Sequence, residues 1–190
     1  MPLFTYIAVC IFAVLVSVIL ILLLYKIRLL KKRLYTDKLT GAKSPAYLDD
    51  YFDKLLVKGT YYVLVDIDQF KDLNTRLGYE NADKVLQYFA DLIMSDDSIF
   101  KIAARYKSGD EFLIVLPDES EKRVLEFLNR LRIRCFEMKG VELKMNFAIT
   151  FSAGITTYSE GDNFSTISLR LVQGLSEAKR TKNTAIVVNH

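Results

Sequence analysis

The chain has 190 residues, with 26 basic and 23 acidic side chains, two cysteines and one histidine. The only histidine is the last residue, His190, which argues against His-based zinc sites and against Ser-His or Cys-His nucleophilic catalysis. Cys10 lies in an apolar run and Cys135 in a helical pattern, so we expect no intramolecular disulfide, as in a reducing compartment.

An apolar segment near the amino terminus is long enough to cross a membrane. Residues 4–24 (FTYIAVCIFAVLVSVILILLL) carry no charged side chain, and as a helix they span a bilayer core of roughly 30 Å. A cleaved signal peptide is one alternative, but it would need basic residues before the apolar run and a small-residue cleavage site after it. A soluble protein with a buried helix is the other. We expect an uncleaved transmembrane helix that continues through Leu34.

Five basic residues follow the apolar run directly: Lys26, Arg28, Lys31, Lys32 and Arg33. The positive-inside rule then predicts a single-pass protein of the inner (cytoplasmic) membrane whose carboxyl-terminal part lies in the cytoplasm. Removing these five from the 26 basic residues leaves 21 against 23 acidic ones. We therefore expect the basic cluster to contact anionic lipid headgroups, and we expect no nucleic-acid partner.

Residues 1–34 thus form the predicted anchor, and residues 35–190 are enough for one domain with a single core. Ser44-Pro45 marks a helix start, with serine as N-cap and proline at the first helical position, and Gly59 suits the end of that helix. Hydrophobic periodicity predicts further helices at 79–94, 121–136 and 164–180, and strands at 60–67, 98–106, 111–117, 144–156 and 184–188.

The order of these elements predicts the fold class. One helix precedes a strand, a helix, a two-stranded hairpin and then alternating helices and strands. Such an order is typical of an α+β domain with a palm-like (ferredoxin-like core) mixed sheet and packed helices, here preceded by one transmembrane helix.

Acidic side chains cluster at two strand ends. Asp66 and Asp68 close the predicted strand 60–67, and because strand side chains alternate between faces, these two share one face. Asp110 and Glu111 lie in the hairpin between the next two strands. Taken singly, each motif is an ordinary strand end or turn. Taken together they predict a site for a hard divalent cation, which takes oxygen ligands and substrate phosphates.

Four ordered motifs carry a family resemblance. They are DKLTG (37–41), DIDQFKDLNTRLGYENAD (66–83), SGDEF (108–112) and EAK (177–179). The chain resembles the GGDEF domain of the diguanylate cyclase family, in a degenerate SGDEF variant, from about Asp37 to Val188. The resemblance implies a palm-like fold and a reaction that joins two GTP molecules into cyclic di-GMP with release of pyrophosphate. It also implies a homodimer in which each domain holds one GTP.

The resemblance assigns the metal and the chemistry to particular residues. Asp66, the backbone carbonyl of Ile67, Asp110 and Glu111 match the positions that hold Mg²⁺ (or Mn²⁺). Glu111 also matches the glutamate that deprotonates the attacking 3′-hydroxyl. Lys71 matches a lysine that binds phosphate during catalysis. These assignments agree with phosphoryl transfer, which depends on positioning and on neutralising negative charge.

Substrate contacts are implied in the same way. Asn74 and Asp83 match the pair that reads the guanine edge, and a carboxylate suits the N1–H and N2–H₂ donors of guanine. Gly109 matches the glycine that lets phosphates approach the backbone. Lys179 matches a phosphate-binding lysine, and Lys182 stands near the position of a family arginine.

The family pattern is altered around these residues. Ser108 replaces the first glycine of the motif, Arg105 stands one residue early because Lys107 intervenes, and IFKI (99–102) occupies the place of the family's inhibitory R-x-x-D. Three hypotheses follow. The first is a membrane-anchored diguanylate cyclase, and the second is a catalytically inactive GGDEF-like module that binds GTP or a protein partner at the inner membrane face. The third is another palm-type nucleotidyltransferase or cyclase that uses a different nucleotide. We expect a regulatory input through the membrane helix, dimerisation or a membrane sensory partner.

Overall fold

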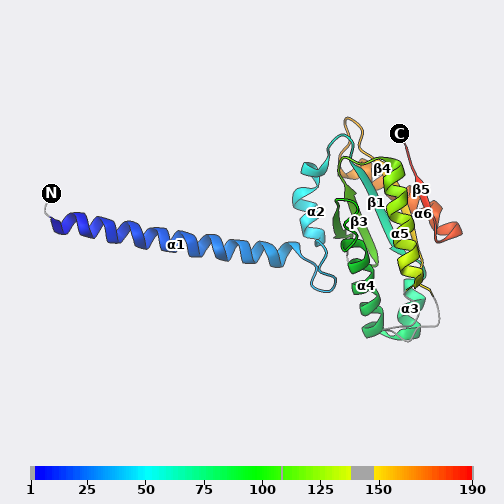
Figure 1. The fold of residues 1–190 in the computed structure, drawn as a ribbon, viewed down its shortest axis with the longest axis horizontal. Helices are drawn as coiled ribbons and strands as arrows, with labels where there is room; N and C mark the ends of the chain where they lie inside the picture. The colour runs from blue at the N-terminus through cyan, green and yellow to red at the C-terminus, as the bar shows by residue number, and fades with distance from the viewer. Residues whose placement is uncertain (1–2, 108, 138–147, 190) are drawn as a thin grey trace.

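The computed structural model describes residues 3–107, 109–137 and 148–189. A long helix projects away from a sheet that is covered by shorter helices (Figure 1). The helices are α1 (Leu3–Tyr35), α2 (Pro45–Tyr51), the 3₁₀ helix η1 (Phe52–Leu55), α3 (Phe70–Leu77), α4 (Tyr79–Met94), α5 (Glu121–Glu137) and α6 (Phe164–Thr181). The strands are β1 (Tyr61–Ile67), β2 (Ile102–Arg105), β3 (Glu111–Leu116), β4 (Phe151–Thr157) and β5 (Ala185–Val187).

The five strands form one mixed sheet in the order β2-β3-β1-β4-β5. β1 lies in the middle and pairs antiparallel with β3 and with β4, while β4 and β5 pair in parallel. The predicted α+β class with a mixed sheet and packed helices is therefore confirmed.

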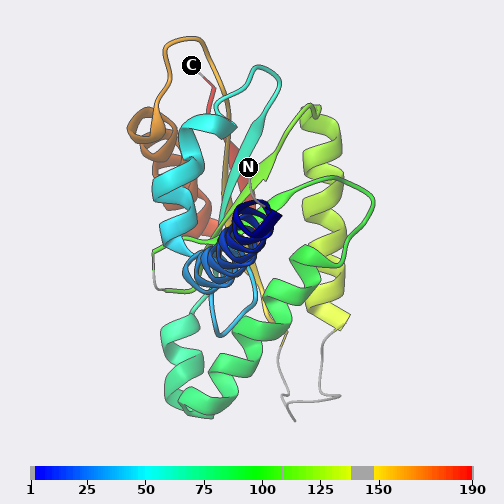
Figure 2. The ribbon, with the colours of Figure 1, turned by 90° about the vertical axis from the view of Figure 1, so that its left-hand side faces the viewer.

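Both faces of the sheet are covered by helices. Val63 and Val65 on β1 face a core that includes residues of α4 and α5. Tyr62 and Leu64 face a second core built with α2 and α6. Figure 2 shows the same two layers, with α2 and α6 on one side of the sheet and α4 and α5 on the other. A strand that is apolar on both faces has to be central, which explains the position of β1.

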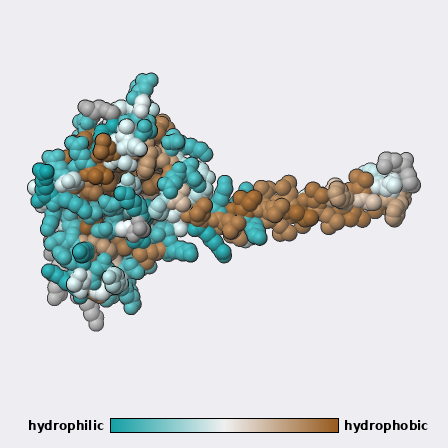
Figure 3. Space-filling model, turned by 180° about the vertical axis from the view of Figure 1, so that it is seen from behind, coloured by the Kyte–Doolittle hydropathy of each residue, from teal (hydrophilic) through white to brown (hydrophobic). Residues whose placement is uncertain are grey.

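α1 is the one helix in the described part of the chain that is long and apolar enough to cross a membrane. No residue of α1 is buried, and Figure 3 shows a nearly continuous hydrophobic surface along it. Its last turn is attached to the domain, because the Ser44 hydroxyl donates to the Leu34 carbonyl at 2.6 Å. The Tyr35 ring lies edge-on to the rings of Tyr47 and Tyr51. Ser44 thus begins α2 as predicted, but its side chain binds α1 instead of capping α2.

One predicted helix is shorter than expected, and one observed helix was not predicted. The helix expected to run from Pro45 towards Gly59 ends at Tyr51 and continues as the 3₁₀ helix η1. α3 was not predicted, because it has eight residues, starts after Gln69 in a left-handed conformation (φ 57°) and has no side-chain cap. Phe70, Leu73 and Leu77 recur at helical spacing and pack against the core, but a segment of eight residues is shorter than the window in which such a pattern predicts a helix.

Two predicted strands are also shorter than expected. Residues 98–101 form a loop, because the Lys101 ammonium donates to the carbonyls of Asp96 and Ile99 and Arg123 donates to that of Ser98. These contacts fold the backbone away from an extended path. The strand expected at 144–156 begins at Phe151, and residues 144–147 lie outside the described residues.

Two glycines let α6 lie directly on the sheet. A Cβ on Gly154 of β4 would stand 2.2 Å from the Leu171 carbonyl oxygen and 2.6 Å from the Leu175 nitrogen. A Cβ on Gly174 of α6 would lie 3.1 Å from the Cα of Gly154. Since no larger residue fits between these backbones, the contact sets how closely α6 approaches β4.

We expect Gly154→Ala to destabilise the fold, because backbone atoms of α6 would have to move away from β4. The expected cost is about 2–3 kcal/mol, which lowers the thermal midpoint by roughly 5–10 °C. The measurement is thermal unfolding followed by circular dichroism in detergent. Gly109→Ala is the control, since its Cβ meets nothing within 4 Å. An unchanged midpoint for Gly154→Ala would contradict the close packing of α6 on β4.

Candidate active site

The site is built around Asp66, near the end of the central strand. In the strand register Asp66 lies opposite Glu111 on β3 and opposite Ser152 on β4. Side chains of directly opposed residues share a face, with Cβ atoms about 5 Å apart. The sheet therefore places two carboxylates and a hydroxyl in one cross-strand row, on the face that α6 covers.

Lys179 contacts Asp66 from the last turn of α6. Its Nζ lies 2.5 Å from Oδ2 of Asp66, although 113 residues separate the two in the sequence. Asp66 is almost fully buried, with 4% of its surface exposed, while the Lys179 side chain is 44% exposed. The ammonium group thus joins the buried carboxylate to the open side of the site.

Burial is the main reason why the pKa of Asp66 is raised to about 6. The hydrogen bond from Lys179 acts in the opposite direction, whereas the charges of Asp110 and Glu111 raise the pKa further. The site therefore holds more negative charge than one lysine balances. A bound cation would relieve this repulsion and stabilise the ionised form of Asp66.

A pocket of about 250 Å³ opens beside this pair. Six residues of the predicted site line it, namely Asp66, Ile67, Lys71, Asp110, Lys179 and Lys182, together with Asp68, Gln69 and Phe70. Glu111 lies next to the pocket as the cross-strand neighbour of Asp66. Lysines and carboxylates that line the same small pocket suit a ligand that carries phosphates and a metal ion.

The remaining predicted contacts do not line this pocket. Asn74 lies on α3 and exposed Asp83 on α4, two helices joined at Gly78, whose N–H donates to the Asn74 carbonyl at 2.9 Å. Gly109 lies in the turn before β3, where its carbonyl accepts a hydrogen bond from Arg105. Ser108 lies outside the described residues.

The side chain of Asp68 has a different role from that of Asp66. Its Oδ1 accepts from the Ser152 hydroxyl at 2.7 Å, and its Oδ2 accepts from the Thr150 hydroxyl at 2.8 Å and the Asn183 N–H at 2.9 Å. These bonds tie the end of β1 to β4 and to the turn after α6. Asp68 therefore stabilises the segments that line the pocket, a structural role that its position in the sequence did not indicate.

The donor set can be compared with the needs of a metal ion. Across the described ranges, no three acidic, histidine or cysteine side chains gather into a ready-made metal cage. Mg²⁺ does not need such a cage, because it is usually held by one or two carboxylates, water and substrate phosphates. Asp66, the Ile67 carbonyl and Asp110 line one pocket and offer oxygen donors of that kind. The residues present therefore fit a phosphate-bound Mg²⁺ or Mn²⁺.

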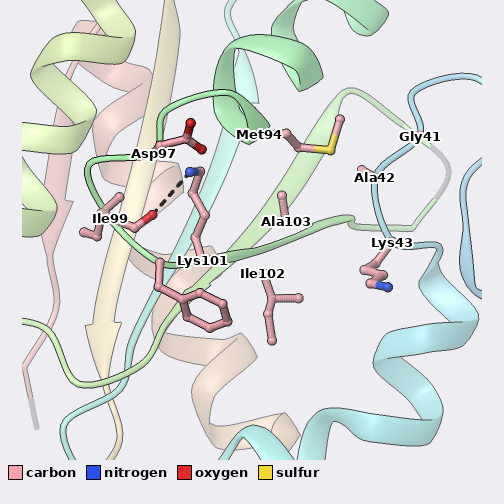
Figure 4. A pocket seen from close by; sticks show the side chains of 10 residues that line it. Gly41, Ala42, Lys43, Met94, Asp97, Ile99, Lys101, Ile102 and Ala103 are labelled. Atoms are coloured by element: carbon pink, nitrogen blue, oxygen red, sulfur yellow. Dashed lines mark hydrogen bonds between the residues drawn. The ribbon is translucent and has the colours of Figure 1, made fainter.

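A larger pocket, of about 450 Å³, lies elsewhere in the domain. It is bounded by residues 41–43, by Met94 at the end of α4, and by Asp97 and residues 99–103 (Figure 4). The Lys101 ammonium turns to backbone carbonyls of its own loop rather than to the pocket. Without paired carboxylates this pocket offers no phosphoryl-transfer chemistry, and it covers the segment where IFKI replaces R-x-x-D.

Comparisons with known proteins identify the family of this chain. Residues 34–185 match the family described as "Diguanylate cyclase, GGDEF domain". The response regulator PleD of Caulobacter vibrioides is 29% identical over 163 residues, which are 80% of this chain and 35% of PleD. The diguanylate cyclase DgcP of Pseudomonas aeruginosa is 30% identical over 160 residues, 79% of this chain and 23% of DgcP. The chain thus spans only about a third or less of the length of these two relatives.

Solved structures show the same fold. The coiled coil and GGDEF domain of DgcB from Caulobacter crescentus, in complex with c-di-GMP, has a TM-score of 0.81 at 23% identity. That match covers 90% of this chain and 95% of the other. The active GGEEF domain of a diguanylate cyclase from Vibrio cholerae has a TM-score of 0.61 at 28% identity, covering 75% and 90% of the two chains. The predicted palm-like fold is confirmed.

We expect Asp66→Asn to stabilise the metal-free protein above pH 6. The folded pKa of about 6 lies above the ordinary value of 3.8, so folding binds a proton between these values and the stability of the wild type falls as the pH rises. Asparagine cannot ionise, so the stability of the variant does not fall in this way. Its advantage should be small at pH 4 and grow to about 1–3 kcal/mol by pH 7.5, measured by urea unfolding in detergent without divalent metal.

Asp68→Asn provides the matched control for this prediction. Its carboxylate oxygens accept three hydrogen bonds, so this variant should lose about 1 kcal/mol at pH 7.5. Equal losses of stability in both variants would show that Asp66 is not under electrostatic strain.

Proposed function

Because the chain belongs to the GGDEF domain family of diguanylate cyclases, we propose that it is a membrane-anchored enzyme that condenses two GTP molecules into cyclic di-GMP and pyrophosphate. The observation that carries the proposal is the pairing of buried Asp66 with Lys179, in one pocket with Asp110, Lys71 and Lys182. The pocket combines acidic groups for a cation with lysines for phosphates, as phosphoryl transfer requires.

The metal side of the proposed site consists of Asp66, the Ile67 carbonyl, Asp110 and Glu111. When bound there, Mg²⁺ or Mn²⁺ neutralises charge on the phosphates of GTP. Glu111, beside Asp66 in the sheet, is the proposed base that takes the proton from the attacking 3′-hydroxyl. Since burial and the charges of Asp110 and Glu111 raise the pKa of Asp66, a bound cation would favour the ionised form of Asp66 at neutral pH.

The substrate side consists of lysines and of the two helices α3 and α4. Lys179 would leave Asp66 for a phosphate oxygen when a cation takes its place, which its partly exposed side chain permits. Lys71 and Lys182 line the same pocket and would bind further phosphate oxygens. Asn74 and Asp83 would select guanine through its donor groups.

The proposed enzyme acts as a homodimer, because each domain holds one GTP and the product contains two. Ile27, Leu30 and Leu34 are half exposed on α1 beyond the apolar run. Their spacing is that of a coiled-coil seam, which would bring two copies together at the membrane. Residues 1–34 would then be both anchor and dimer stalk, and residues 35–190 the catalytic domain.

A catalytically inactive module that binds GTP or a partner protein is the second candidate. The altered turn favours it, because Lys107 lies between Tyr106 and the motif in a left-handed conformation (φ 54°). The diguanylate cyclase SiaD from Pseudomonas aeruginosa, whose solved structure resembles this fold, forms a complex with its activator SiaC. A membrane or cytoplasmic partner that controls this chain would be compatible with either candidate.

We expect the full chain in detergent to convert GTP with Mg²⁺ into cyclic di-GMP, measured by chromatography of the products. Asp110→Ala combined with Glu111→Ala should lower the rate at least about 100-fold, because the site loses a metal ligand and its base. Glu126→Ala, on the exposed face of α5, is the control. Specific activity should rise with protein concentration, since two copies form the active unit.

Other outcomes of this assay decide between the candidates. No cyclic dinucleotide from the wild type, with GTP still bound, would favour the inactive module. Preference for ATP over GTP would contradict the proposed part of Asp83 and favour a cyclase for another nucleotide.

We expect the domain to lie on the cytoplasmic side of the inner membrane, because the basic residues after the apolar run are retained there. Two fusions after His190 test this topology. A fluorescent protein that matures only in the cytoplasm should be active, and an alkaline phosphatase that needs the periplasm should not. The reverse pattern would overturn the proposed orientation, and recovery of both fusions in the soluble fraction would overturn the anchor.

A further inference from the structure

Arg105 joins two segments that are far apart in the sequence. It is the last residue of β2, and its side chain is 11% exposed. Its Nη1 lies 3.2 Å from Oδ1 of Asp37, and its Nε donates to the Gly109 carbonyl oxygen at 2.8 Å. Asp37 follows the end of α1 by two residues, and Gly109 directly precedes Asp110. One guanidinium thus contacts both the junction with α1 and the acidic turn.

The Asp37 carboxylate is held in a closed loop. Its Oδ1 also accepts from the Thr40 N–H at 2.9 Å and the Thr40 hydroxyl at 2.7 Å, and the Asp37 N–H donates to the Ala42 carbonyl at 2.8 Å. Burial acts to raise the pKa of Asp37, but the hydrogen bonds from Thr40 and the charge of Arg105 outweigh it and lower the pKa. Asp37 is therefore a fixed, ionised partner at neutral pH.

The same loop is bound to α1 on one side and to β2 on the other. The Ser44 hydroxyl donates to the Leu34 carbonyl at 2.6 Å. The Lys43 N–H donates to the Ala103 carbonyl at 2.9 Å, and the Arg105 N–H donates to the Lys43 carbonyl at 2.8 Å. Figure 4 shows Lys43 close to the strand that carries Ala103. A displacement of the last turn of α1 would therefore be transmitted to the loop and to β2.

The acidic turn is held at its base and at Gly109. The Tyr106 N–H donates to the Glu111 carbonyl at 2.8 Å and closes the hairpin. Lys107 adds a residue in a left-handed conformation, so the turn is longer than the family pattern. Because a peptide unit is planar and trans, a hydrogen bond to the Gly109 carbonyl also fixes the direction of the Asp110 N–H.

We propose that Arg105 is a positioning residue that orients the Gly109–Asp110 peptide in the active site and couples this peptide to the end of α1. The inference rests on the proposed function, because that function places Asp110 in the site. A lysine cannot replace Arg105, since a single ammonium lacks the planar fork whose N–H groups point in two directions.

The test compares Arg105→Lys and Asp37→Asn with a matched control, Arg123→Lys, in the full chain in detergent. Arg123 also contacts one carboxylate and one backbone carbonyl, with Glu119 at 3.1 Å and the Ser98 carbonyl at 2.7 Å. It lies in the first turn of α5 and contacts the loop between α4 and β2, away from the acidic turn. The control variant measures how much activity and thermal stability are lost when an arginine that makes two such contacts is replaced by lysine away from the acidic turn.

Cyclic di-GMP synthesis gives the first measurement. We expect Arg105→Lys to lower the rate at saturating GTP by about 10- to 100-fold, because a small misplacement of a catalytic group has such effects. The KM for GTP should stay within about threefold, since the lysines and the base contacts remain. Asp37→Asn should lower the rate about tenfold, and the double variant should be no slower than Arg105→Lys, because both changes act through one guanidinium.

Amide hydrogen exchange over residues 106–112 gives a second measurement, which does not depend on catalysis. Exchange in Arg105→Lys and Asp37→Asn should be about tenfold faster than in the wild type and in Arg123→Lys, because the turn is no longer anchored. If the wild type makes no cyclic dinucleotide, the proposed function fails, and the exchange rates still decide whether Arg105 holds the turn.

Two results would overturn the inference. One is an Arg105→Lys variant whose turn exchanges within twofold of the wild type. The other is an equal loss of thermal midpoint and of activity in Arg105→Lys and Arg123→Lys, which would show a purely structural role.

Discussion

A carboxylate buried in the middle of the sheet is the constraint on which this site depends. Asp66 lies on the central strand, opposite Glu111 and close to Asp110. Its carboxylate is almost fully buried, so water screens it poorly from the charges of these two partly exposed neighbours. Its raised pKa reflects that cost. The strand holds the Asp66 carboxylate at a fixed place, so the side chain cannot turn towards water to lower this electrostatic cost. A cation with a phosphate ligand would lower it instead.

The packing of α6 supplies the opposite charge. Gly154 and Gly174 allow the backbone of α6 to pack against β4. Lys179 follows Gly174 by five residues on the same helix, and this position places it beside Asp66. The lysine therefore reaches the acid because two glycines far from the pocket lack side chains. Stability and chemistry are coupled here, since the same close contact that forms the core also sets the geometry of the pair.

The junction between α1 and the domain is also an ordered structure rather than a loose linker. Three contacts hold the end of α1 against α2 and β2. The Ser44 hydroxyl donates to the Leu34 carbonyl, the Tyr35 ring lies edge-on to the stacked rings of Tyr47 and Tyr51, and the loop at Asp37 is closed by its own hydrogen bonds. A membrane helix that is attached in this way would pass changes of its position or dimerisation to the domain. This attachment gives the proposed enzyme a physical route for an input, although the sequence resembles no sensory module.

Local patterns in the sequence determined the parts of this protein that depend on neighbouring residues. The apolar run predicted α1, hydrophobic periodicity predicted α4 with its observed limits at Tyr79 and Met94, and the motifs around Asp66 and Asp110 pointed to one acidic site. The two helices are found where they were predicted, because hydrophobic spacing is a property of short segments. Asp66 and Asp110 line one pocket in the structure, and their role as a metal site stays a prediction.

The tertiary structure alone decided the contacts between distant segments. Lys179 meets Asp66 across 113 residues, and Asp68 accepts hydrogen bonds from Thr150, Ser152 and Asn183. Arg105, which stood out of step with the family motif, contacts both Asp37 and Gly109. Such pairs depend on strand register and on how closely a helix approaches the sheet. Neither is encoded in the spacing of residues along one segment, so only the folded chain shows which charges meet.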